Sequence, residues 1–237
     1  MRVVLVHGSV GNGEATWAPL RPLAERFELV VPNRSGYPPN PPLDRIDFEE
    51  QAVELEPLLG DGAHLVGHSY GGVISLLLAA RRPDAIRSLT VSEPPAFGVA
   101  RGNPDVERLV SELAAFFAAG PYEPAEYLRG FLVLVGSAMT LPDLLPPALE
   151  QGARAAMAER PPWEAEIPLA ALAAAPFPRL VISGGHNGAF DAVCDVLEAR
   201  LEAERAVLPG AGHSLPRAPG YGERLAAFVS TAEQRPR

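Results

Sequence analysis

Short apolar runs alternate along this chain with longer stretches in which apolar residues recur every three or four positions. The runs cover residues 2–7, 28–32, 63–68, 87–92, 179–184 and 204–208, and each has the length of a buried strand. The periodic stretches cover residues 16–26, 45–59, 70–82, 189–202 and 219–231, and they predict helices. Strands that alternate with helices form a parallel sheet covered on both faces. The pattern therefore predicts an α/β fold with a mostly parallel sheet of about six strands.

Residues 97–177 interrupt this alternation. Their helical stretches, at 105–119, 124–136 and 141–159, are separated by prolines. We expect residues 1–96 and 178–237 to form the core, with residues 97–177 inserted as a helical lid. Large apolar side chains of the insertion are candidates for lining an apolar pocket, although some must form the lid's own core. They are Phe116, Phe117, Tyr122, Tyr127, Phe131, Met139 and Trp163.

The hexapeptide GHSYGG, at residues 67–72, lies between a predicted strand and the helix that follows it. A strand that turns sharply into a helix strains the central serine, and the small residues on either side let the backbone close. The serine hydroxyl then stands exposed above the sheet, where the helix N-terminus favours negative charge. This context predicts that Ser69 is a nucleophile.

A nucleophilic serine needs a base, and His213 is our candidate among the five histidines. It lies in a glycine-flanked loop after the last predicted strand and precedes the final helix. His7 and His68 belong to other motifs, His64 opens a strand, and His186 sits in a glycine-rich turn. A solvated loop histidine is the alternative interpretation of His213.

The residues His7, Gly8 and Ser9 follow the first predicted strand. Acyl transfer passes through a tetrahedral oxyanion that needs two preorganised N–H donors. The expected donors are the amide of Tyr70, which follows the nucleophile, and the amide of Ser9.

With these motifs the chain resembles the α/β-hydrolase superfamily, specifically its small, lid-bearing esterase and lactonase branch. The resemblance extends from Val3 to about Val229, and the sequence NRSGY at residues 33–37 is similar to the superfamily's loop after its second strand. It implies an α/β-hydrolase fold, an order of nucleophile first and histidine last, and a catalytic acid.

The position of that acid departs from the usual pattern. Most relatives carry an aspartate in a turn after the penultimate strand, and here the equivalent turn holds Asn187. A neutral amide cannot stabilise the imidazolium that forms when the serine loses its proton. Glu93, at the end of the strand 87–92, lies on the same rim as Ser69 and His213, as in certain dehalogenases and zearalenone-type lactonases. We favour Glu93 over Asn187 or Asp191, although a glutamate before proline can also merely end a strand.

Composition narrows the class of protein. The 237 residues are 47% hydrophobic and 21% charged, which is ordinary for one soluble enzyme domain. A net charge of −9 disfavours nucleic-acid and anionic-membrane partners. The single Cys194 excludes an intrachain disulfide and suits the cytoplasm. Met1 leads directly into a predicted strand, so we expect a cytoplasmic protein without a signal peptide. The sequence has no metal-spaced His/Cys cluster and no phosphate-binding loop, so we expect neither a metal nor a cofactor.

These features predict a serine hydrolase that cleaves a small carboxylic ester or lactone with a hydrophobic moiety, through an acyl-enzyme. A C–C bond hydrolase, a thioesterase or a perhydrolase could use the same parts. A different class of protein, a weakly active ligand-binding pseudoenzyme, is suggested by the missing aspartate.

Overall fold

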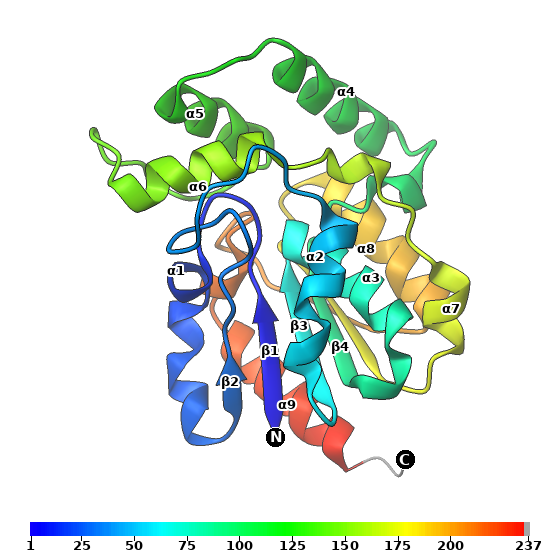
Figure 1. Ribbon diagram of the computed structural model, residues 1–237. Helices are drawn as coiled ribbons and strands as arrows, with labels where there is room; N and C mark the ends of the chain where they lie inside the picture. Colours follow the sequence, from blue (N-terminus) through cyan, green and yellow to red (C-terminus); the bar gives the residue numbers. More distant parts are fainter. Residues whose placement is uncertain (235–237) are drawn as a thin grey trace.

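A single parallel β-sheet organises residues 1–234, the part of the chain that the computed structural model describes (Figure 1). Its strands are β1 (Arg2–Val6), β2 (Glu28–Val30), β3 (Ala63–His68), β4 (Ile86–Ser92), β5 (Arg179–Ser183) and β6 (Glu204–Val207). They are ordered β2-β1-β3-β4-β5-β6, and each neighbouring pair is parallel. The predicted six-stranded α/β fold is confirmed.

Helices cover both faces of this sheet. One face is covered by α2 (Phe48–Leu55), α3 (Tyr70–Arg81) and α8 (Gly188–Leu201), and the other by α1 (Gly13–Trp17) and α9 (Tyr221–Glu233). Side chains of a strand point alternately to its two sides. Val4 and Val6 of β1 accordingly join the core under α2, α3 and α8, whereas Val3 and Leu5 join the core under α1 and α9.

Two helices differ from their predicted bounds, and each contains a 3-10 segment with a proline. The stretch predicted as a helix over 16–26 is the short α1 followed by a 3-10 helix, Ala18–Glu25, which contains Pro22. The stretch predicted over 45–59 begins only after Asp47, whose carboxylate accepts hydrogen bonds from two amides of the first turn. It changes to a 3-10 helix, Glu56–Leu59, at Pro57, because proline has no N–H for the α-helical pattern.

Most of the helical insertion lies above the carboxyl ends of the strands (Figure 1). Its helices are α4 (Pro104–Ala118), α5 (Pro124–Leu134), α6 (Pro147–Met157) and α7 (Leu169–Ala174). The first three form the upper layer in Figure 1, whereas α7 lies lower and contacts α3 and α8. The role of residues 97–177 as a lid stays a prediction.

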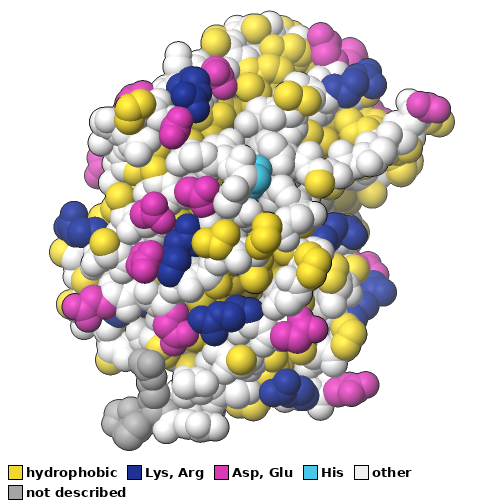
Figure 2. Space-filling view, turned by 180° about the vertical axis from the view of Figure 1, so that it is seen from behind, with side chains coloured by type: hydrophobic (Ala, Val, Ile, Leu, Met, Phe, Trp, Pro, Cys, Tyr) yellow, Lys and Arg dark blue, Asp and Glu magenta, His cyan; other side chains and the backbone are white. Residues whose placement is uncertain are grey.

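The surface mixes charges of both signs, as the face in Figure 2 shows. Exposed pairs such as Arg2 with Glu28 and Arg224 with Glu204, both at 2.8 Å, are typical. Such pairs contribute only about 0–1 kcal/mol each, so the buried core dominates the stability of the fold. Within residues 1–234, no helix combines the length and the apolar character needed to cross a bilayer.

Candidate active site

The turn between β3 and α3 holds Ser69 in a strained conformation, with φ 54° and ψ −128°. Two glycines make this turn possible. A Cβ on Gly67 would lie 2.4 Å from the carbonyl oxygen of Gly71. A Cβ on Gly71 would lie 2.4 Å from the carbonyl oxygens of both Val6 and His7. Because real Cβ atoms do not approach backbone so closely, any larger residue at either position would displace the serine.

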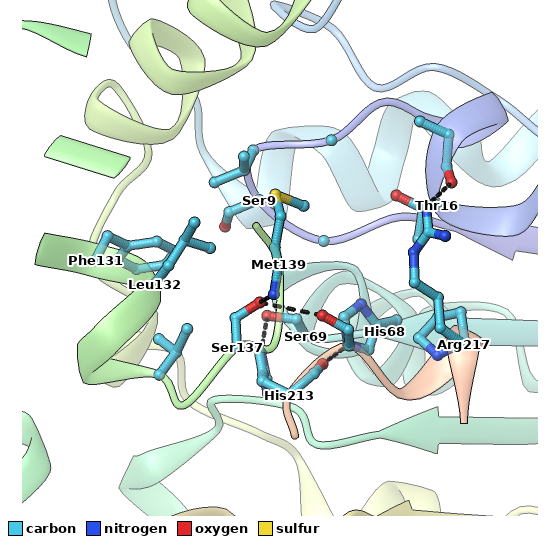
Figure 3. A pocket seen from close by; sticks show the side chains of 17 residues that line it. Ser9, Thr16, His68, Ser69, Phe131, Leu132, Ser137, Met139, His213 and Arg217 are labelled. Carbon is cyan, nitrogen blue, oxygen red and sulfur yellow. Dashed lines mark hydrogen bonds between the residues drawn. The ribbon is translucent and has the colours of Figure 1, made fainter. Parts of the chain in front are cut away.

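Ser69, His213 and Glu93 are joined by two hydrogen bonds. His213 Nε2 lies 2.8 Å from Ser69 Oγ, and His213 Nδ1 lies 2.7 Å from Glu93 Oε2. An ionised carboxylate can only accept, so Nδ1 carries the imidazole proton and the lone pair of Nε2 faces the serine hydroxyl. Figure 3 shows this contact between His213 and Ser69 at the wall of a pocket. The structure thus brings together the three residues that the sequence suggested as a triad.

Glu93 is fully buried at the carboxyl end of β4, in a backbone conformation with φ 42°. Its Oε1 accepts a hydrogen bond of 2.7 Å from the amide of Gly184 and lies 3.3 Å from His186 Nδ1. Burial by itself would raise the pKa of Glu93, but hydrogen bonds from His186 and His213 outweigh it and hold the pKa at about 2. Glu93 is therefore a carboxylate at neutral pH.

The two alternative acids lie elsewhere. Asn187 is the N-cap of α8, and its side-chain oxygen accepts a hydrogen bond of 3.0 Å from the amide of Ala189. Asp191 accepts a hydrogen bond of 2.5 Å from Ser183 Oγ and lies 3.5 Å from Arg205. Both side chains are thus engaged with partners other than His213.

His186 is a member of the site that the sequence did not reveal. Besides its contact with Glu93, its Nε2 lies 3.2 Å from the carbonyl oxygen of Val135, the residue that caps α5. The sequence does hold one signal for His186, because this residue lies in the turn that usually carries the catalytic aspartate. Its partner on α5 is 51 positions away in the chain and could not be identified from the sequence.

The loop after β1 passes directly beside the nucleophile. A Cβ on Gly8 would lie 2.8 Å from Ser69 Cβ and 3.0 Å from the carbonyl oxygen of His68. His7 fixes the loop, since its Nδ1 donates to the carbonyl of Gly8 at 2.8 Å and its Nε2 accepts from the amide of Arg34 at 3.0 Å. Burial and the nearby Arg34 guanidinium hold the pKa of His7 well below its usual range, so the ring is neutral and keeps this tautomer.

A buried carboxylate holds the side chain of Ser9 in the same loop. Ser9 Oγ donates a 2.5 Å hydrogen bond to Glu159, which follows α6. Glu159 also pairs with the guanidinium of Arg34 and accepts a hydrogen bond of 2.8 Å from Tyr37. The network therefore connects the end of α6 to the loop whose amide was predicted to bind an oxyanion. The second predicted donor, Tyr70, is the first residue of α3, where helical amides have no partner within the helix.

Two adjoining cavities meet at Ser69. An outer one opens beside the loop after β1 and is drawn in Figure 3, and an inner one extends beneath the inserted helices. Ser9, Ser69, Phe131 and Val135 line both. Most other residues of the inner cavity are apolar, including Pro95, Phe97, Leu113, Phe117, Tyr127, Ala156, Pro162, Trp163 and Phe190.

Not every aromatic residue of the insertion contributes to this lining. Phe117, Tyr127, Phe131 and Trp163 line the inner cavity, and Met139 lines the outer one. Phe116 and Tyr122 instead stack on each other with ring centroids 4.6 Å apart. Their packing stabilises the helical layer itself.

A metal ion does not suit the carboxylate-histidine cluster. The ligand atoms of Glu93, His186 and His213 lie within 4.8 Å of one another. However, the 2.7 Å between Glu93 Oε2 and His213 Nδ1 is a hydrogen-bond length. Ligands placed tetrahedrally around zinc at about 2.0–2.1 Å lie roughly 3.3 Å apart, so the spacing fits a shared proton.

Comparison with known proteins supports one family over almost the whole chain. A model described as the alpha/beta hydrolase family matches residues 3–227. The pimeloyl-(acyl-carrier protein) methyl ester esterase of Methylococcus capsulatus is 31% identical over 168 residues, which are 70% of this chain and 62% of that protein. The corresponding esterase of Aeromonas hydrophila is 32% identical over 99 residues, 40% of this chain and 39% of its own length. The chain thus spans less than two thirds of each of these relatives.

A solved structure extends the comparison to nearly the full chain. The structure described as "Est816 as an N-Acyl homoserine lactone degrading enzyme" superposes with a TM-score of 0.70. It is 21% identical, and the alignment covers 96% of this chain and 93% of that one. At this identity the likeness concerns the fold.

Proposed function

The chain belongs to the alpha/beta hydrolase family, and we propose that it is a serine hydrolase of carboxylic esters or lactones that carry a hydrophobic moiety. One observation carries the proposal: an uninterrupted pair of hydrogen bonds runs from Ser69 through His213 to a buried, ionised Glu93. This is the arrangement of nucleophile, base and acid that acyl transfer requires.

Acylation begins when Ser69 Oγ attacks the substrate carbonyl and its proton passes to His213 Nε2, 2.8 Å away. Glu93 stabilises the imidazolium that results. In our assignment the amides of Ser9 and Tyr70 donate hydrogen bonds to the oxyanion. The tetrahedral intermediate collapses when His213 returns the proton to the leaving oxygen, and the acyl-enzyme remains.

Deacylation repeats these steps with water. His213 takes a proton from the water as its oxygen attacks the acyl carbonyl, and it then returns the proton to Ser69 Oγ as the ester bond breaks. The products are the free acid and the regenerated enzyme. Every proton transfer involves the same ring nitrogen, so no cofactor is needed.

The two cavities indicate the kind of substrate. The inner cavity is lined mainly by aromatic and aliphatic side chains, and a hydrophobic group would bury apolar surface there. The lining of the outer cavity also includes serine, threonine and arginine, so this cavity would receive the more polar part of the substrate. The names of the relatives, a methyl ester esterase and a lactone-degrading enzyme, agree with ester and lactone substrates.

We assign residues 97–177 as the lid of this enzyme. The assignment is supported by α5, which contributes Phe131 to the lining of both cavities, and by Trp163, which lines the inner one. Within this segment α4, α5, α6 and the connection that follows α6 contribute residues to the lining of the inner cavity, whereas α7 contributes none and contacts α3 and α8. The covering part therefore consists of α4 to α6 and that connection.

Turnover of a p-nitrophenyl ester series tests the proposal. The wild-type protein should hydrolyse the esters, and Ser69→Ala should reduce turnover by at least ~10³-fold without changing the unfolding midpoint. A ligand-binding pseudoenzyme would bind the esters without releasing p-nitrophenol. Equal turnover by the two proteins would exclude the serine mechanism.

A further inference from the structure

His186 lies between the carboxylate of the triad and the end of a helix in the insertion. Its Nδ1 is 3.3 Å from Glu93 Oε1, and its Nε2 is 3.2 Å from the carbonyl oxygen of Val135. A carboxylate and a backbone carbonyl are both acceptors. An imidazole that donates to both acceptors carries a proton on each nitrogen and is then a cation.

Three features favour that cation. Glu93 is fully buried and ionised, so it attracts a positive charge strongly. Val135 caps the 11-residue helix α5, and the C-terminus of a helix carries partial negative charge. Asp191, on α8, adds a more distant negative charge. The hydrogen bond to Glu93 outweighs burial and raises the pKa of His186.

The same end of α5 also holds the loop of the catalytic histidine. The amide of His213 donates to the carbonyl of Gly136 at 3.0 Å, and Ser137 pairs with Gly212 in an antiparallel bridge. A Cβ on Gly136 would lie 2.7 Å from the His186 ring, so the chain passes directly over it. Glu93 and the end of α5 therefore contact one side of a partly exposed imidazole, and His213 lies nearby.

We propose that His186 is a positioning residue: as a cation it fixes the triad carboxylate, restrains the end of α5, and lowers the basicity of His213. The last part rests on the proposed function, whereas the charge of His186 and its restraint of α5 do not. Val135 lines both cavities, so the restraint acts directly on the wall of the substrate site.

The charges that face His186 determine whether its pKa is raised or lowered. Glu93, after β4, and Asp191 favour its proton, and a protonated His213, in the loop after β6, opposes it. The pKa of His186 is raised in the folded protein, so its stabilising contribution is fully present below its unfolded pKa. That contribution is lost as the pH rises through the folded value. At higher pH the neutral ring can donate to Glu93 or to Val135, but not to both.

Removing the cation should make His213 bind a proton more readily. The two ring centroids are 6.3 Å apart. Like charges at this distance repel, so a cationic His186 opposes the proton that His213 takes up from Ser69. The acid limb of Ser69 reactivity should therefore move to higher pH in His186→Gln.

The matched control is Asn187→Ala. Asn187 occupies the same turn and caps α8, but its side chain bonds to Ala189 rather than to the triad. Asn187→Ala therefore shows what happens when the turn is loosened and His186 itself is kept. We expect a lower melting temperature with an unchanged pH dependence of Ser69 reactivity.

Two measurements test the inference. The first is an NMR titration of the ¹⁵N-labelled imidazoles, in which the His186 midpoint should be higher in the folded protein than in the urea-unfolded chain. A folded midpoint at or below the unfolded one overturns the proposal, whether or not the protein is an esterase.

The second measurement is the rate of fluorophosphonate labelling of Ser69 as a function of pH, which requires no substrate turnover. A shift of the acid limb in His186→Gln, absent in Asn187→Ala, supports the effect on His213. An unmoved limb, or an equal shift in both variants, overturns it and leaves His186 with a structural role. If wild-type protein reacts with fluorophosphonate but hydrolyses no ester or lactone, the proposed function fails while this inference stands.

Discussion

Replacing Glu93 by glutamine removes one negative charge from the buried end of β4 and changes little else in size. Two donors compete for the new side chain. His213 Nδ1 now faces Oε2, and the amide of Gly184 faces Oε1. A neutral amide has only one oxygen, so one of these donors loses its acceptor. If the amide NH₂ faces His213, the ring adopts the opposite tautomer, and no lone pair remains for the proton of Ser69.

The loss of activity follows from this geometry. The neutral side chain cannot stabilise the imidazolium, and the wrong tautomer cannot accept the serine proton. We expect kcat to fall by about 10²–10⁴-fold, which corresponds to roughly 3–5 kcal/mol of transition-state stabilisation. KM should change little, because Glu93 is fully buried and is absent from the lining of both cavities.

The free energy of unfolding should also depend on the ionisation of Glu93, and therefore on pH. The environment lowers the pKa of Glu93 from 4.5 to about 2. A shift of this size is about 3 kcal/mol of stabilisation, fully present above the unfolded pKa and lost as the pH falls through the folded value. The wild-type unfolding free energy should therefore decline between pH 4.5 and 2 more steeply than that of Glu93→Gln.

Ester turnover by Glu93→Gln and Asn187→Ala, compared with wild type, is the assay. The first variant should lose activity as stated, and the second should retain most of it, because Asn187 contacts Ala189 rather than His213. The opposite ranking would refute Glu93 as the acid. Partial recovery of activity in the double variant Glu93→Gln/Asn187→Asp would show that an acid at the usual position can substitute.

Three further predictions concern the surroundings of the triad. Gly71→Ala places a Cβ 2.4 Å from two carbonyl oxygens and should lower the free energy of unfolding in urea by roughly 1–3 kcal/mol. The control Gly222→Ala should not, because its Cβ meets only a leucine methyl at 3.4 Å. Glu159→Gln leaves a buried arginine without its charged partner and should cost about 3–5 kcal/mol, with a lower kcat because the oxyanion loop loosens. An unchanged unfolding midpoint would contradict this account of the network. Trp163→Ala enlarges the inner cavity, so the enzyme should prefer p-nitrophenyl esters with longer acyl chains. Phe116→Leu alters a ring outside the cavity lining and should leave this preference unchanged.

The elements that could be predicted from the sequence depend on local patterns. The serine turn needs only a strand, two glycines and a helix within a few residues, and the structure has all of them where expected. The approach of His213 to Glu93 could be anticipated because the carboxyl ends of parallel strands meet at one edge of a sheet. The prediction of an α-helix over residues 18–25 is wrong, because the apolar spacing does not reveal that the prolines of this stretch favour a 3-10 helix.

The contacts that could not be predicted join distant segments. Ser9 and Glu159 are 150 positions apart, and no local pattern indicates that the end of α6 reaches the loop after β1. The sequence shows His186 only as a turn residue, because its role depends on the carbonyl of Val135, a backbone group present at every position. Such contacts depend on how the inserted helices pack, which neither periodicity nor spacing specifies.

Reaction with a fluorophosphonate probe followed by peptide mass spectrometry tests the proposed mechanism most directly. We expect a single adduct on Ser69, formed in wild type, greatly slowed in His213→Ala, and absent in Ser69→Ala. The probe should also abolish ester hydrolysis in proportion to the labelled fraction. An adduct on another residue, or full hydrolysis by protein whose Ser69 is completely labelled, would contradict the proposed serine mechanism.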